Sequence, residues 1–161
     1  MTDARGRGPG VVVPPPFIFV AGFLVGWLLD ARLGPLGPSI IPEARTIVDL
    51  IGGLLVGIGL GLALSGIRTF RRAKTSVIPN RDASLLVITG PYRYTRNPMY
   101  VGLTTIYVGA ALVLSLDWSL LTLPIVLWAL SRYVIRREER YLTSAFGDQY
   151  RQYQQTVRRW L

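Results

Sequence analysis

The sequence predicts an all-α polytopic membrane protein with about four transmembrane helices. Half of its 161 residues are hydrophobic, only 17% are charged, and the mean hydropathy is +0.38. A soluble domain carries about 25% charged residues. The apolar residues are also gathered into long runs instead of alternating with polar ones, which is typical of helices that span lipid. The length fits a single membrane domain covering residues 1–161.

The first two spans are expected at residues 15–33 and 46–67. A cleaved signal peptide is the alternative for the first run, but Leu29 stands where a cleavage site needs a small residue. A loop rich in Gly and Pro separates the two runs. The second run is close to the roughly 20 residues that cross a bilayer, so both are read as spanning helices.

Three glycines in the second span repeat at intervals of four residues: Gly53, Gly57 and Gly61. Glycines at this spacing leave one helix face without side chains, so another helix can approach closely. We expect a helix to pack on this face, from this chain or from a second copy in a homo-oligomer. A groove for lipid or ligand is the alternative use.

The third and fourth spans are expected at residues 100–116 and 118–135, with Pro124 as a kink. The short turn between them forces an antiparallel helical hairpin. The last segment, residues 136–161, is polar and is expected to form an amphipathic cytoplasmic tail that Gly147 interrupts. A short helix from Asp148 would place Tyr150, Tyr153 and Val157 on one stripe suited to the membrane interface.

Positive charges give the orientation. Of 18 Lys and Arg residues, only Arg32 and Arg45 fall outside the amino-terminal segment, residues 68–96 and residues 132–159. By the positive-inside rule, both termini and the loop before the third span face the cytoplasm. The same rule accounts for the net charge of +9, so no nucleic-acid partner is expected. The expected location is the cell membrane.

Composition also limits the chemistry, because the chain contains no Cys and no His. Disulfides, Cys/His metal sites and Ser-His or Cys-His nucleophiles are therefore excluded, and no metal site is predicted. Any reaction must rely on carboxylates, Arg, Lys, Tyr, amides and backbone groups.

Two stretches carry the residues best suited to such chemistry: a loop at residues 84–99, continuing into the third span, and the run Arg136-Arg137-Glu138-Glu139. The hairpin brings both to one cytoplasmic site. Prolines and Gly90 make the loop rigid, and its tyrosines offer aromatic faces that attract a sulfonium or ammonium cation. Taken alone, the paired glutamates fit either an interfacial ion pair with neighbouring arginines or a ligand site.

The two stretches together resemble the membrane methyltransferases that include isoprenylcysteine carboxyl methyltransferases and phospholipid N-methyltransferases. The pattern of that group is Arg-His-Pro-x-Tyr-x-Gly, a hydrophobic stretch, and Glu-Glu. Here it reads Arg96-Asn97-Pro98-Met99-Tyr100-Val101-Gly102 and then Glu138-Glu139, followed by Phe146-Gly147 and Tyr150. The resemblance covers about half of the chain.

The resemblance implies an S-adenosylmethionine-dependent methyltransferase that acts at the cytoplasmic surface on a lipophilic acceptor arriving from the bilayer. Alignment of the acceptor with an already electrophilic methyl group needs little acid or base help, which suits a chain without His. The implied catalytic residues are Asn97, Tyr100 and Glu138. The implied cofactor-binding residues are Leu85, Leu86, Val87, Gly90, Tyr92, Arg96, Asn97, Pro98, Met99, Tyr100, Glu138 and Glu139.

Two departures from the pattern keep the acceptor open. Asn97 replaces His, so proton removal cannot be assigned to an imidazole there. Val134 stands where prenylcysteine enzymes have an Arg, with Arg132 or Arg136 as candidate replacements. A phospholipid ethanolamine N-methyltransferase and a small-thiol methyltransferase are therefore alternatives. A non-catalytic scaffold that binds anionic lipid headgroups through Arg93 and Arg96 is the alternative outside enzymes.

Overall fold

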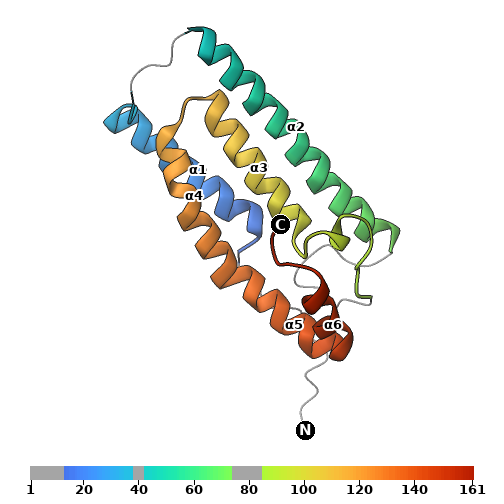
Figure 1. Ribbon diagram of the computed structural model, residues 1–161. Coiled ribbons are helices and arrows are strands. Elements are labelled where there is room, and N and C mark those ends of the chain that lie inside the picture. Colours follow the sequence, from blue (N-terminus) through green and yellow to red (C-terminus); the bar gives the residue numbers. More distant parts are fainter. Residues whose placement is uncertain (1–12, 38–41, 74–84) are drawn as a thin grey trace.

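A computed structural model describes residues 13–37, 42–73 and 85–161, and this part of the chain is helical with no strand (Figure 1). The elements, in chain order, are α1 (Pro15–Leu33), α2 (Pro42–Arg72), the 3₁₀ turn η2 (Gly90–Arg93), α3 (Pro98–Val113), α4 (Asp117–Leu130), the π turn η3 (Ser131–Ile135), α5 (Arg136–Phe146) and α6 (Asp148–Thr156). The predicted fold class is therefore confirmed. The first part of the predicted cofactor loop, residue 84, and the amino-terminal residues before 13 lie outside the described residues.

Within the described residues, three helices are long and apolar enough to cross a membrane: α1, α2 and the continuous helix from Asp117 to Phe146. The fourth apolar helix, α3, has only 16 residues. The bounds of α1 match the predicted span, whereas α2 begins earlier and ends later than predicted. At 1.5 Å per residue, the 31 residues of α2 exceed the thickness of the hydrocarbon core, so its ends project from it.

The helix that contains the fourth span extends past residue 135, where the predicted span ends. It continues through η3 into α5 and stops only at Gly147, whose φ is +55°. Sequence reasoning took the change from apolar to charged residues as the end of an element, but no Gly or Pro follows Pro124 before Gly147. Residues 136–140 are all charged and cannot lie in hydrocarbon, so α5 is the part of this helix beyond the membrane.

The helices pack as two pairs. α2 lies along α3 and α1 lies along α4, whereas α3 and α4 contact each other much less although a short turn joins them. In the second pair, Gly26 faces the backbone of Ser119, and the Thr122 hydroxyl donates to the Gly22 carbonyl at 3.1 Å. Tyr107 on α3 reaches across to Thr122 at 2.7 Å and links the two pairs.

Close packing of α2 on α3 uses a different glycine face from the predicted one. A Cβ atom added at Gly59 would lie 2.6 Å from the Gly102 carbonyl oxygen, and one at Gly52 would lie 2.8 Å from the Gly109 oxygen. Gly53, Gly57 and Gly61 instead face open space. The prediction that they receive a helix is wrong for packing within this chain. Contact with a second copy stays a prediction.

The buried apolar core lies where α1, α3 and α4 approach one another, near the end of the bundle at which α3 begins. Its buried residues are Phe19, Tyr100, Tyr107, Val126, Leu130, Val134 and Ile135. Trp160, from the end of the chain, packs against this cluster. Figure 1 shows the C-terminus accordingly returning to the middle of the bundle, between α3 and α4. The core therefore supports the start of α3, where the candidate site begins.

Candidate functional site

The loop before α3 is held against the end of α2. Gly90 has a φ of +61°, and a Cβ atom there would lie 2.9 Å from the Thr69 hydroxyl oxygen, so glycine is required on both counts. Pro91 is the second residue of the η2 turn, which begins at Gly90. Tyr92 is buried, with its ring edge-on to Phe70 at 5.2 Å between centroids. This part of the predicted cofactor loop is a packed structural element.

The two halves of the motif meet through Tyr100 and Glu138. Pro98 is the first residue of α3, which suits its fixed φ and missing N–H, and Tyr100 follows in the same turn of the helix. The buried Tyr100 hydroxyl donates to Oε1 of Glu138 at 2.8 Å. Residues 38 positions apart in sequence are thus joined by one hydrogen bond. The predicted convergence of the loop and the Glu-Glu pair is present in the fold.

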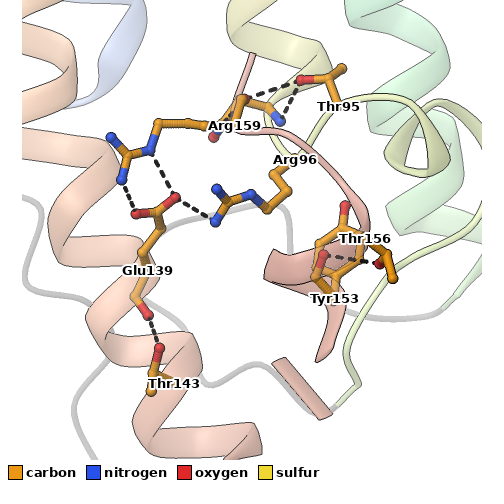
Figure 2. Close-up of polar contacts among 8 residues, drawn as sticks. Thr95, Arg96, Glu139, Thr143, Tyr153, Thr156 and Arg159 are labelled. Atoms are coloured by element: carbon orange, nitrogen blue, oxygen red, sulfur yellow. Dashed lines mark hydrogen bonds and ion pairs between the residues drawn. The ribbon is translucent and has the colours of Figure 1, made fainter. Parts of the chain in front are cut away.

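Glu139 is held by two arginines, as Figure 2 shows. Its Oε1 accepts from Nη1 of Arg96 at 2.9 Å and from Nε of Arg159 at 3.0 Å, and its Oε2 accepts from Nη2 of Arg159 at 2.6 Å. The Glu139 and Arg96 side chains are only 12% and 13% exposed. Glu139 therefore forms a nearly buried ion-pair network, with partners other than its sequence neighbours.

The two adjacent glutamates consequently differ in electrostatics. Glu138 is half-buried, and its only hydrogen bond among the described side chains is the one from Tyr100. Burial raises the pKa of Glu138 to about 7, the Tyr100 hydrogen bond opposes this shift, and the nearby Glu139 carboxylate adds to it. An acid with a pKa near neutrality can exchange a proton at physiological pH.

Two buried polar atoms at the site have no hydrogen-bond partner within the described parts of the chain: the Tyr92 hydroxyl and Nε of Arg96. Buried polar groups in folded proteins are nearly always paired. Burial also raises the pKa of the Tyr92 hydroxyl, helped by Tyr153 and by Glu138, so the hydroxyl stays protonated and can donate. These atoms are suited to bind polar groups of a ligand.

The carboxy-terminal residues 157–161, called the C-terminal strap below, form a third part of the site. The Arg96 N–H donates to the Arg158 carbonyl at 2.9 Å. The Arg159 carbonyl accepts from the Thr95 hydroxyl at 3.1 Å and from Nδ2 of Asn97 at 2.9 Å. Sequence reasoning missed Arg159, because no motif marks it and arginine is common near a membrane surface.

The predicted interfacial stripe on α6 is wrong. Tyr150 is 2% exposed, and the buried Tyr153 hydroxyl donates to the Tyr92 carbonyl at 2.6 Å. Both rings pack inside the protein, because Gly147 turns α6 back onto the loop before α3. Burial and the Glu139 carboxylate raise the pKa of Tyr150 to about 12, while Arg96 opposes the shift.

The remaining predicted residues are divided between the interior and the surface. Val87 and Pro98 are buried, Leu86 is partly buried, and Met99 packs beside Gly66 of α2. Leu85 is 54% exposed and does not join them. The structure thus buries several of the predicted residues from the loop and the start of α3, and their contact with a cofactor stays a prediction.

Neither arginine considered as a replacement for Val134 is buried at the site. Val134 is 1% exposed in the core. Arg132 and Arg136 are exposed, and the Arg132 guanidinium lies 5.9 Å from the centroid of the Tyr133 ring. Tyr133 itself is 52% exposed, so this pair lies on the outer surface of the helix.

Several known proteins are similar in sequence to this chain. A protein-S-isoprenylcysteine O-methyltransferase of Schizosaccharomyces pombe is 42% identical over 78 residues, which are 48% of this chain and 33% of that protein. The Saccharomyces cerevisiae protein of the same name is 30% identical over 116 residues, 71% of this chain and 48% of that protein. An uncharacterized Haemophilus influenzae protein is 43% identical over 63 residues, 39% of this chain and its own full length.

The chain thus spans between a third and a half of the length of these two named relatives. The family model described as phospholipid methyltransferase matches residues 48–149, which include both halves of the motif and most of the α2–α3 pair. This match covers well over half of the chain, and the chain therefore belongs to the phospholipid methyltransferase family.

Proposed function

We propose that this protein is an S-adenosylmethionine-dependent methyltransferase that acts at the cytoplasmic membrane surface on a lipophilic acceptor, as isoprenylcysteine carboxyl methyltransferases do. The observation that carries the proposal is the Tyr100–Glu138 hydrogen bond, which joins the two halves of the motif beside unpartnered buried polar atoms. The names of the relatives support methyl transfer as the reaction.

The residues present fit the cofactor. S-Adenosylmethionine has a carboxylate, an ammonium, a sulfonium and ribose hydroxyls. Nε of Arg96 and the Tyr92 hydroxyl are the buried donors for its anionic or hydroxyl oxygens, and Glu138 is an acceptor for an N–H or O–H group. Aromatic rings at Tyr92 and Tyr100 favour a nearby cation. When bound, the cofactor supplies a methyl group already activated by its positive sulfur.

The chain's own residues then have two tasks. The rigid start of α3 and the Glu139 network hold the donors in place, which is catalysis by orientation. Glu138 accepts the proton that an amine or thiol acceptor loses, since its pKa of about 7 lies close to the working pH. Asn97 has its Nδ2 bonded to the Arg159 carbonyl, so it helps to position the loop.

A second candidate acceptor is a lipid amine or thiol without a carboxylate. One observation favours it: Arg132 and Arg136 are exposed and Val134 is buried, while Arg96 and Arg159 are both engaged by Glu139. A carboxylate acceptor would have to recruit a cation from this network. The scaffold alternative keeps only one of its two arginines, because Arg96 is bound by Glu139 whereas Arg93 is exposed.

Calorimetry on the purified chain in detergent, with S-adenosylmethionine and S-adenosylhomocysteine, tests the proposal. We expect both ligands to bind. If neither binds up to millimolar concentration, the proposed function is wrong. Transfer of labelled methyl groups into a prenylcysteine analogue, an ethanolamine phospholipid and a lipophilic thiol then distinguishes the acceptors. Strong labelling of the prenylcysteine carboxylate alone would rule out the second candidate.

The orientation has its own test, because the chain has no Cys to remove. Single cysteines replacing the exposed Arg151 of α6 and Leu36 at the opposite end are expected to react with a membrane-impermeant thiol reagent from opposite sides. Labelling of Arg151→Cys from outside intact cells would contradict a cytoplasmic site.

A further inference from the structure

Arg159 contacts both halves of the candidate site with two different parts of the residue. Its guanidinium donates hydrogen bonds to both carboxylate oxygens of Glu139 on α5, at 3.0 and 2.6 Å. Its backbone carbonyl accepts from Thr95 and Asn97 at the start of α3. No other residue described at this site is bonded in this way to both stretches that carry the motif, and Arg159 lies 20 positions beyond Glu139.

The contact between Arg159 and Glu139 also determines the positions of Arg96 and Glu138. Arg96 uses Nη1 for Glu139 and leaves Nε without a partner, so its position depends on where the Glu139 carboxylate is held. Glu138 is adjacent in sequence, and its hydrogen bond to Tyr100 requires the first turn of α5 to keep its place. A two-pronged guanidinium contact fixes the direction as well as the position of a carboxylate.

The strap has a second attachment that keeps Arg159 in place. Trp160 packs against the core cluster that includes Tyr100 and Leu130. Arg159 itself is 36% exposed and stands at the edge of the network. The strap is therefore anchored on one side by apolar packing and on the other by the ion pair.

We propose that Arg159 is a positioning residue of the cofactor site, acting through Glu139 and Asn97 on Arg96 and Glu138. The inference rests on the proposed function and deepens it, because it adds the C-terminal strap to the two motif stretches as a third component of that site. Arg159 does not touch the cofactor. It holds the residues that do.

The test uses Arg159→Gln and Arg159→Lys in the full chain, with S-adenosylhomocysteine affinity measured by calorimetry well below each melting temperature. We expect Arg159→Gln to weaken binding by about tenfold or more, the scale of a lost hydrogen bond to a charged group. Arg159→Lys keeps the positive charge but loses the two-pronged contact, so its affinity should lie between those of Arg159→Gln and the wild type. Arg151→Gln breaks an ion pair of similar length on α6, 2.7 Å to Asp148, and should leave affinity unchanged.

A double variant separates positioning from direct contact. If Arg159 acts through Glu139, adding Arg159→Gln to Glu139→Gln should weaken binding little further. Fully additive losses would mean that Arg159 meets the cofactor itself and would overturn the positioning role.

A lower melting temperature with unchanged affinity would overturn the role as well, because it would show a purely structural contact. If Arg159→Gln does not fold, Arg159→Lys decides, and wild-type affinity in that variant rejects the inference. Wild-type protein that binds no cofactor overturns the proposed function and this inference together. Wild-type binding with normal affinity in both Arg159 variants overturns only the inference.

Discussion

The two ends of the helix bundle are built from the same kinds of residue but differ in how those residues are bonded. At the end away from the site, Arg45 donates to the Val113 carbonyl and the Ser115 hydroxyl and pairs with Asp49 at 2.6 Å. The Asp117 carboxylate accepts from the Leu36 N–H at 3.0 Å. These contacts tie the start of α2 and the end of α1 to the α3–α4 turn.

At the end where α3 begins, by contrast, the loop before α3, the first turn of α5, α6 and the C-terminal strap converge on a half-buried acid. Glu138 there has a pKa raised to about 7, and polar atoms of Tyr92 and Arg96 lie buried without a partner. At the end away from the site, the arginine and carboxylate side chains only hold neighbouring helix ends together. The same groups, held together with unsatisfied buried atoms, form the candidate binding site.

The strongest test of this difference is Glu138→Gln. The variant keeps the shape but removes the charge, so we expect cofactor affinity to fall by roughly 10- to 100-fold. Titration calorimetry measures the change. Arg151→Ala, on an exposed ion pair of α6, is the control and should bind normally. Equal losses in both variants would show that the site lies elsewhere.

The same Glu138→Gln variant should also reduce the dependence of stability on pH. The folded-state pKa is raised from 4.5 to about 7, so between these values the folded chain holds a proton that the unfolded chain has released. The free energy of unfolding of the wild type therefore falls as pH rises through this window. Melting curves at pH 5 and pH 8 should show this fall in the wild type and a smaller one in the variant. Identical pH dependence would contradict a buried Glu138.

Between the two ends, Gly102→Ala should destabilise the α2–α3 pair. The new Cβ atom would lie 2.7 Å from the Gly59 carbonyl oxygen and 2.8 Å from the Ala63 nitrogen. Overpacking of this kind costs about 1–3 kcal/mol. Gly57→Ala, whose Cβ atom would meet open space, is the matched control for thermal unfolding. A larger loss in Gly57→Ala would instead reveal a partner on that face.

Tyr100→Phe tests the contribution of the hydrogen bond between Tyr100 and Glu138. Loss of the hydroxyl leaves Glu138 without its donor at 2.8 Å, and we expect cofactor affinity to fall by about tenfold, less than in Glu138→Gln. The ring stays in the core, so the fold should persist. Binding measured beside Tyr107→Phe, whose hydroxyl bonds only within the helix bundle, checks the specificity of the loss.

The smallest effect is expected at the far end. Arg45→Gln removes a partly exposed ion pair and its contacts to the α3–α4 turn, so it should lower stability by about 1 kcal/mol. Cofactor affinity should not change. A clear loss of affinity in this variant would show that the two ends of the bundle are coupled, and would contradict their separate roles.

Several parts of the site could be predicted from sequence because they depend on local or topological rules. The short turn after α3 brings residues 96–100 and 138–139 to one end of the bundle whatever the details of packing. The partners of Glu139 could not be predicted in this way. Arg136, Arg137 and Arg140 are nearer in sequence, yet the bonded residues are Arg96 and Arg159, because α5 faces the loop and the strap.

The sequence by itself determined the helical membrane class, the approximate spans and the meeting of the two motif stretches, since long apolar runs and short turns leave few alternatives. Only the tertiary structure decided which glycine face packs, that α4 continues into α5, and that Tyr150, Tyr153 and Arg159 belong to the site. Those outcomes depend on the relative rotation of packed helices and on a chain end returning to the core. No local sequence pattern encodes either one.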